Sequence, residues 1–283
     1  MREIHAMRTM LISRRRACLS RTGPVAIAIL AIVLPACGSV AARTADASEA
    51  TEEDARQTAQ DAASGEAGTS TIDATATGPV LVQQATASTA AASTVSATLT
   101  NPTTVGNLLV VVGATPEGPL KSVTGGGAAT WMLATFSATN ANMEIWYGVV
   151  TASSSTPVEI VYGGSKALEM RLNVTEWSGL ATTQGVLDAE SSQAGKTTSA
   201  SAPAITTNAA DLIVFAAVAT APTGSFTDPS NGPWTGMTPI TLSGSWTQSS
   251  WYQTLPASTA FQPMVAVPGT AWDASIAAFK IAP

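Results

Sequence analysis

The chain has 283 residues, a net charge of −6 and a charged fraction of 11%, so it is long enough for one large domain or two small ones. Cations are few and scattered after the N-terminal 37 residues, which argues against nucleic acid as a partner. The single histidine is His5. The rest of the chain therefore lacks the imidazole of Ser-His-Asp or Cys-His catalysis and of histidine zinc sites, and we expect no metal and no cofactor.

The first 36 residues have the features of an export signal peptide. Arginines at 14–16 and 21 precede an apolar run at 25–34. A membrane-spanning helix needs about 20 apolar residues, whereas a run of this length is typical of the centre of a signal peptide. The pair Arg15-Arg16 also resembles a twin-arginine signal, so the general and the twin-arginine export routes both stay open.

Residues 34–37, Leu-Pro-Ala-Cys, resemble the lipobox of bacterial lipoproteins. The resemblance implies that Cys37 is acylated and becomes the first residue of the mature chain, while Cys18 is removed with the signal. Several acyl chains on one residue attach a protein stably to a membrane, which would be the membrane partner of this chain. Gly38 follows the cysteine, and by resemblance to Gram-negative lipoproteins this implies the outer membrane or the cell surface.

Residues 37–78 are predicted to be a disordered linker between the lipid and a folded domain. The segment is rich in Ala, Thr, Ser and acidic residues and has almost no aromatic or branched apolar side chains. Such a sequence buries too little apolar surface to offset the entropy lost on ordering.

Residues 79–283 have the pattern of many short β-strands, in which apolar runs are separated by Gly, Pro, Asn and Ser. Apolar and polar residues alternate in 168–177, as in a half-buried antiparallel strand. We therefore predict an all-β, antiparallel domain. Its clearest strands are at 107–115, 130–138, 143–151, 158–164 and 169–177.

The domain contains an internal repeat, with pseudo-repeats at about 80–180 and 186–283. Five landmarks recur in the same order at offsets of 102 to 106 residues. The segment GNLLVVVGAT (106–115) recurs as ADLIVFAAVAT (210–220), VLV at 80 as VLD at 186, Trp131 as Trp234, Trp146-Tyr147 as Trp251-Tyr252, and 173–179 as 275–281.

Two related halves fit either two separate seven-stranded sandwiches or one large jelly-roll or lectin-like β-sandwich in which the halves interleave. We favour the single sandwich, because the segment between the halves, 178–186, lacks the Pro-rich or charged character of a domain boundary. The order of the motifs resembles that of an uncharacterised class of secreted bacterial β-sandwich modules. That resemblance implies a fold and no activity.

Tryptophan is the most informative residue type for binding, since all seven lie after residue 130. In each half a Trp-Tyr pair lies on a strand, so its two rings point to opposite faces. If Tyr147 faces the core, Glu144 and Trp146 face solvent. Trp251 and Gln253 are the corresponding candidates in the second half. An exposed indole beside a carboxylate or amide can bind a sugar ring or a protein, while core packing is the alternative.

Glu176 continues the apolar face of the 168–177 strand, which predicts a buried carboxylate with a raised pKa. A carboxylate whose hydrogen bonds are satisfied at the end of a strand is the alternative. Paired with a second acid such as Glu144, it would suit glycoside cleavage.

Three functions follow from these observations. The leading hypothesis is a non-catalytic, membrane-anchored surface lipoprotein whose β-sandwich binds an extracellular glycan or protein. The alternatives are a carboxylate-dependent polysaccharide hydrolase or lyase and a purely structural envelope protein.

Overall fold

The computed structural model describes residues 78–283 except 184, 239 and 241–245. The predicted signal peptide, Cys37 and nearly all of the predicted linker lie outside the described residues. Within the described part the chain forms antiparallel strands and no helix, so the predicted all-β fold is confirmed. In particular, none of these residues belongs to a helix long and apolar enough to cross a membrane.

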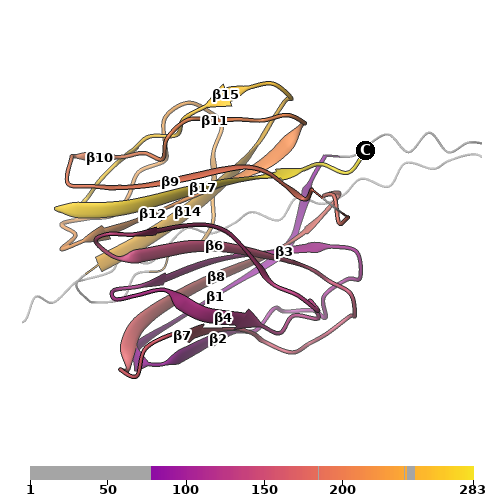
Figure 1. Ribbon diagram of the computed structural model, residues 1–283, viewed down its shortest axis with the longest axis horizontal. Helices are drawn as coiled ribbons and strands as arrows, with labels where there is room; N and C mark the ends of the chain where they lie inside the picture. The colour runs from indigo at the N-terminus through magenta and orange to yellow at the C-terminus, as the bar shows by residue number, and fades with distance from the viewer. Residues whose placement is uncertain (1–77, 184, 239, 241–245) are drawn as a thin grey trace, which may run out of the picture. The chain divides into compact units, whose positions relative to one another are not determined.

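The first half of the domain forms two antiparallel sheets (Figure 1). The five-stranded sheet has the order β1 (Val80–Ala92), β8 (Leu168–Ser178), β3 (Leu108–Thr115), β6 (Asn142–Val149) and β5 (Met132–Ala138). The three-stranded sheet has the order β2 (Thr94–Ala97), β7 (Val158–Tyr162) and β4 (Leu120–Thr124).

The second half forms a five-stranded sheet and two short ribbons, all antiparallel. The sheet has the order β13 (Thr235–Gly236), β14 (Trp246–Leu255), β12 (Asp211–Thr220), β17 (Ala271–Lys280) and β9 (Leu187–Gly195). The ribbons pair β10 (Ser199–Ala200) with β16 (Val265–Ala266) and β11 (Ile205–Thr206) with β15 (Ala260–Phe261).

The two five-stranded sheets repeat one topology, which confirms that the sandwich is built from two related halves. Strands β1, β8, β3, β6 and β5 of the first sheet correspond in order to β9, β17, β12, β14 and β13 of the second. The register repeats as well. Val110 lies opposite Tyr147 between β3 and β6, just as Val214 lies opposite Tyr252 between β12 and β14.

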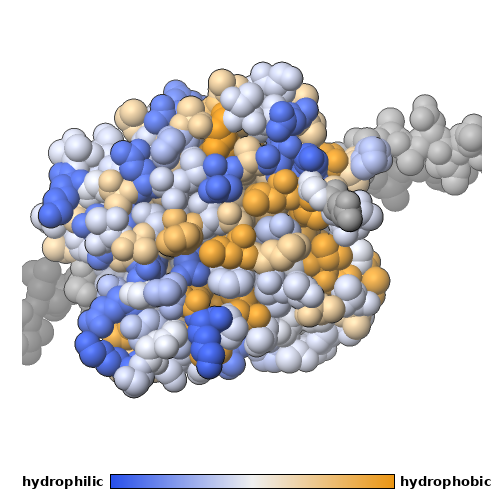
Figure 2. All heavy atoms as spheres, in the orientation of Figure 1, coloured by the Kyte–Doolittle hydropathy of each residue, from blue (hydrophilic) through white to orange (hydrophobic). Residues whose placement is uncertain are grey.

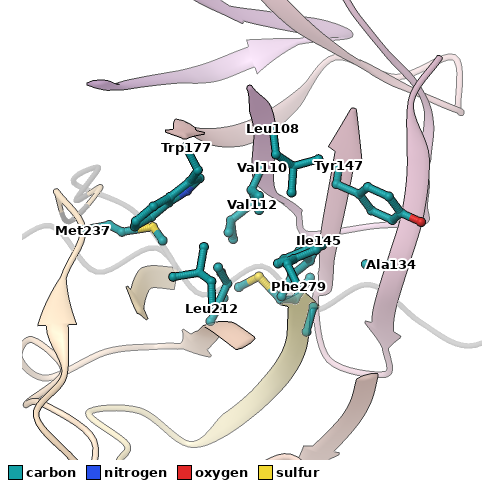
Figure 3. Packing of buried hydrophobic residues seen from close by; sticks show 14 of the residues in the cluster. Leu108, Val110, Val112, Ala134, Ile145, Tyr147, Trp177, Leu212, Met237 and Phe279 are labelled. Carbon is teal, nitrogen blue, oxygen red and sulfur yellow. The ribbon is translucent and has the colours of Figure 1, made fainter. Parts of the chain in front are cut away.

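The two five-stranded sheets pack face to face around one shared core (Figures 1 and 3). Each half contributes one complete sheet, so the strands of the halves share a core without mixing in one sheet. The core residues labelled in Figure 3 come from both halves and include Val110, Ile145 and Trp177 from the first and Leu212 and Phe279 from the second. The shared core agrees with the expected β-sandwich, but the two halves do not interleave, because each five-stranded sheet comes from one half.

The outer face of each five-stranded sheet is covered too. In the first half Val111 and Val174 pack with Ile160 of the three-stranded sheet. In the second half Phe215 packs with Val265 from a ribbon strand. Central strands such as β3 and β12 are therefore apolar over most of their length, as expected of strands buried on both faces.

The buried carboxylate of Asp273 joins the two halves. Asp273 lies on β17 of the second half and is 0% exposed. It accepts hydrogen bonds from Ser137 Oγ at 2.6 Å and from the backbone N–H groups of Thr139, Asn140 and Ala141 at 3.1, 3.0 and 2.8 Å. The donors belong to the end of β5 and the turn into β6, so one side chain of the second half holds a hairpin of the first.

Removing this carboxylate should destabilise the whole sandwich. We expect Asp273→Ala to lower the free energy of unfolding by about 3–5 kcal/mol, because four donors lose a charged acceptor in a buried site. Chemical denaturation measures this change. Glu190→Ala on the neighbouring strand β9 is the matched control and should change stability little, since Glu190 is exposed. Equal stability of the two variants would contradict the assignment.

Candidate functional site

Trp146 and Glu144 lie together, but inside the structure. Glu144 is 2% exposed and accepts hydrogen bonds from the backbone N–H of Leu120 and from Trp146 Nε1, both at 2.7 Å. Burial raises the pKa of the Glu144 carboxyl, and these two hydrogen bonds oppose the shift. The half-buried Trp146 packs on the core beneath the three-stranded sheet. The expectation that Glu144 faces solvent was wrong, because a second sheet covers that face.

Trp251 and Gln253 are also buried, at 3% and 5% exposed, so the expected exposed ring is not at Trp251. The Trp251 ring stacks on Phe215 at 5.7 Å between centroids, and its Nε1 donates to Asp228 Oδ1 at 3.2 Å. Trp251 is buried because the two short ribbons cover the outer face of the second five-stranded sheet. All seven tryptophans of the chain are buried or half-buried, so none offers a fully exposed ring for stacking on a sugar.

Glu176 is fully buried, as predicted. Its carboxylate accepts hydrogen bonds from Gln83 Nε2 at 2.5 Å, from the backbone N–H of Thr104 at 2.8 Å and from Asn107 Nδ2 at 2.7 Å. These contacts connect β8 to β1 and to the loop before β3. Glu176 therefore fits the second alternative, a structural carboxylate whose hydrogen bonds are satisfied by neighbouring groups.

Glu144 and Glu176 are not brought together. Glu144 lies opposite Gly113 of β3, whereas Glu176 lies opposite Leu109 on the other side of the same strand. Four residues of strand separate these positions by about 13 Å, more than the spacing of a glycosidase carboxylate pair. Both side chains are also buried. This pair lacks the geometry that the hydrolase hypothesis requires.

Exposed apolar side chains are most numerous on β5. Seven large hydrophobic residues of the described part are exposed, and three of them lie on this seven-residue strand: Met132, Leu133 and Phe136, at 40%, 41% and 53%. We call these three residues the β5 apolar surface. The strand is an edge of its sheet and has an irregularity between Leu133 and Thr135, a feature that redirects side chains.

A hollow of about 510 Å³ lies beside this surface. Its floor is continuous with the shared core through Tyr147 and Val186. Figure 3 shows the Tyr147 ring at the margin of the core with its hydroxyl directed away from it. The residues that line the hollow are all uncharged: Met132, Tyr147, Val149, Thr182, Thr183, Gly185, Val186 and Leu187.

Figure 2 shows one face of the domain, on which hydrophobic residues gather across the middle, where the two five-stranded sheets meet.

A second hollow, of about 380 Å³, lies along β5 and is lined by Leu133, Phe136 and Glu190, among others. Apolar surface therefore extends along β5 beyond the first hollow. Glu190 is the one charged residue in the lining of the second.

A cluster of charged groups anchors the segment that forms one wall of the first hollow. Asp188 is the extra residue of a bulge in β9, since Ala278 pairs with Ala189 and Phe279 with Leu187. Its carboxylate is 3.4 Å from Lys280 Nζ and also accepts hydrogen bonds from the backbone N–H groups of the 208–209 segment. The bulge turns Asp188 toward the end of β12, where Asp211 lies fully buried.

Burial, together with the adjacent Asp188 carboxylate, raises the pKa of Asp211 to about 7, and Lys280 opposes the shift. For Asp188, burial alone would raise the pKa, but hydrogen bonds from Asn208, Asp211 and Ala209 lower it overall. Sequence reasoning missed this cluster. Asp188 and Asp211 become neighbours only because β9 and β12 both flank β17.

Comparison with protein families, with curated proteins and with solved structures found no match for this chain. Across the described residues, no group of three or more His, Cys, Asp or Glu side chains is placed to hold a metal ion. The β5 apolar surface and its hollow are therefore the candidate functional site on geometry alone.

The Asp188–Asp211 pair makes stability depend on pH. The pKa of Asp211 is about 7 in the folded chain, whereas the ordinary pKa of an aspartate is 3.8. Asp211 therefore keeps its proton up to about pH 7 when the chain is folded. The unfolded chain loses this proton earlier, so the contribution of Asp211 to stability falls as pH rises from about 4 to about 7. We expect Asp211→Asn, which cannot ionise, to reduce this fall.

Denaturant unfolding of the full-length chain between about pH 5 and pH 8 measures the effect. The matched control is Asp228→Asn, because Asp228 is exposed. If Asp211→Asn and the unchanged chain lose stability equally over this range, Asp211 does not hold the proton.

Proposed function

We propose that this chain is an exported, lipid-anchored surface lipoprotein whose β-sandwich binds a protein at the β5 apolar surface and performs no catalysis. The observation that carries the binding proposal is the concentration of exposed Met132, Leu133 and Phe136 on one strand beside an uncharged hollow. The proposed anchor rests on the resemblance of residues 34–37 to a lipobox.

The chemistry of the surface favours an apolar, uncharged protein partner. Exposed apolar side chains that gather on one part of a protein surface often mark an interaction site. Met and Phe are enriched in the buried centres of protein interfaces, while charged residues are depleted there. The hollow has the same character, because its lining has no charge and its floor is the apolar core.

A glycan is the less favoured ligand. Sugar recognition by a β-sandwich would use an exposed aromatic ring with polar groups beside it. Every Trp of this chain is at least half-buried, and the polar groups of Glu144 and Trp146 bind each other. The hydrolase or lyase alternative lacks its carboxylate pair at Glu144 and Glu176. A purely structural envelope role would leave the β5 apolar surface without a partner.

Site-specific cross-linking in intact cells tests the binding site. A photoreactive amino acid in place of Phe136 should give one discrete cross-linked protein, because Phe136 would lie in the interface. The control has the same photoreactive amino acid in place of the exposed Thr124 on β4 and should not give this cross-linked protein. The adduct should disappear when Leu133→Ser is added.

The cross-linked protein, once identified and purified, should bind the full-length chain at least about tenfold more tightly than the Leu133→Ser variant. Equal adducts from positions 136 and 124 would contradict the proposed site. Binding of a glycan that is lost in Leu133→Ser would assign the same surface to a sugar and overturn the protein proposal.

Metabolic labelling with a radioactive fatty acid tests the proposed anchor separately. The full-length chain should incorporate label, and Cys37→Ser should abolish it because the acceptor sulfur is lost. Cys18→Ser is the matched control and should retain the label, since residue 18 would leave with the signal peptide. Label that persists in Cys37→Ser would refute acylation at this residue.

A further inference from the structure

The outer edge of β1 is open in the described part of the structure. Strand β1 is the longest of the domain, with 13 residues, and pairs through backbone hydrogen bonds only with β8. No other backbone hydrogen bond recorded for the described residues involves Val80–Ala92. In an antiparallel strand about half of the N–H and C=O groups point away from the one partner, so β1 presents a row of unpaired groups.

The middle of this edge lacks the features with which proteins protect exposed strands. Those features include charged side chains, prolines and very short strands. The sequence of β1, VLVQQATASTAAA, contains neither a charge nor a proline. Irregularities occur near its two ends, but seven residues from Gln83 to Thr89 pair one to one with Glu176 to Met170.

The other edges of the five-stranded sheets differ. Strand β13 has only two residues. Strand β9 carries Asp188 and Glu190. Strand β5 lies beside β9, where Ser192 Oγ donates to the backbone oxygen of Phe136 at 2.5 Å. Among the described strands, β1 is therefore the long, uncharged sheet edge.

We propose that β1 pairs with β1 of a second copy of this chain, antiparallel and about a two-fold axis, to form one continuous ten-stranded sheet. A second copy fits because its β1 edge has the same unpaired N–H and C=O groups. Pairing about a two-fold axis gives the backbone groups of both edges their hydrogen-bond partners at once. In such a pairing, residues near the axis meet their own counterparts. A charge there would oppose itself, and β1 has none.

The side chains of the regular segment are compatible with this pairing. With the axis at Thr86, each Thr86 faces its counterpart and Gln84 faces Ser88, which are small or flexible polar pairs. These three side chains are exposed. The association is independent of the proposed function, because β1 and β5 lie at opposite edges of the same sheet.

Sedimentation equilibrium of the full-length chain tests the proposal. The chain would carry Cys37→Ser and be kept in reducing buffer, so that neither acyl groups nor disulfides mediate association. We expect a monomer–dimer equilibrium between about 10 µM and 1 mM. Thr86→Lys should weaken the dimer at least about tenfold, because two ammonium groups would meet at the axis.

Thr124→Lys adds the same charge at an exposed position of β4 and should leave the dimer unchanged. Thermal unfolding followed by circular dichroism verifies that both variants fold. A chain that stays monomeric throughout, a dimer unaffected by Thr86→Lys, or equal weakening by the two lysines would each overturn pairing through β1.

Discussion

The carboxylate of Asp273 is the contact on which the position of β5 depends. It is buried on β17 of the second half, and its four donors lie at the end of β5 and in the turn into β6 of the first. A buried carboxylate without partners is costly, and so are unpaired backbone N–H groups. The two requirements are met only when the hairpin lies on the second sheet. The candidate binding surface thus depends on a side chain from the other half of the repeat.

The shared core and the two covered outer faces account for where the apolar residues lie. Most strands of the two large sheets are buried on both faces, so the abundant apolar residues are mainly internal. Of the seven exposed large hydrophobic residues in the described part, five lie on the edge strands β1 and β5, and Val105 and Met264 lie in loops. Strand β5 exposes three large apolar side chains, whereas β1 exposes Val80 and Val82 at its start and small or polar side chains beyond them, next to unpaired backbone groups. These edges therefore suit different kinds of contact, one through side chains and the other through the backbone.

Part of this architecture could be predicted from the sequence. Periodicity gave the main strands, and the spacing of repeated motifs revealed the two halves that share one topology. The burial of Glu176 followed from its place in an apolar row. The burial of Glu144 and Trp251 did not, because alternation identifies two faces without revealing that further layers cover both. The Asp273 contacts and the Asp188–Asp211 pair were missed because each joins residues distant in sequence.

We infer that Asp273 makes the β5–β6 hairpin part of one cooperative unit with the second half. Native-state hydrogen exchange of the amides of Thr139, Asn140 and Ala141 tests it most directly. If the account is correct, these three turn amides exchange only on global unfolding, with the same free energy as amides in the middle of β12. Exchange at the rate of an exposed loop, while β12 stays protected, would contradict it.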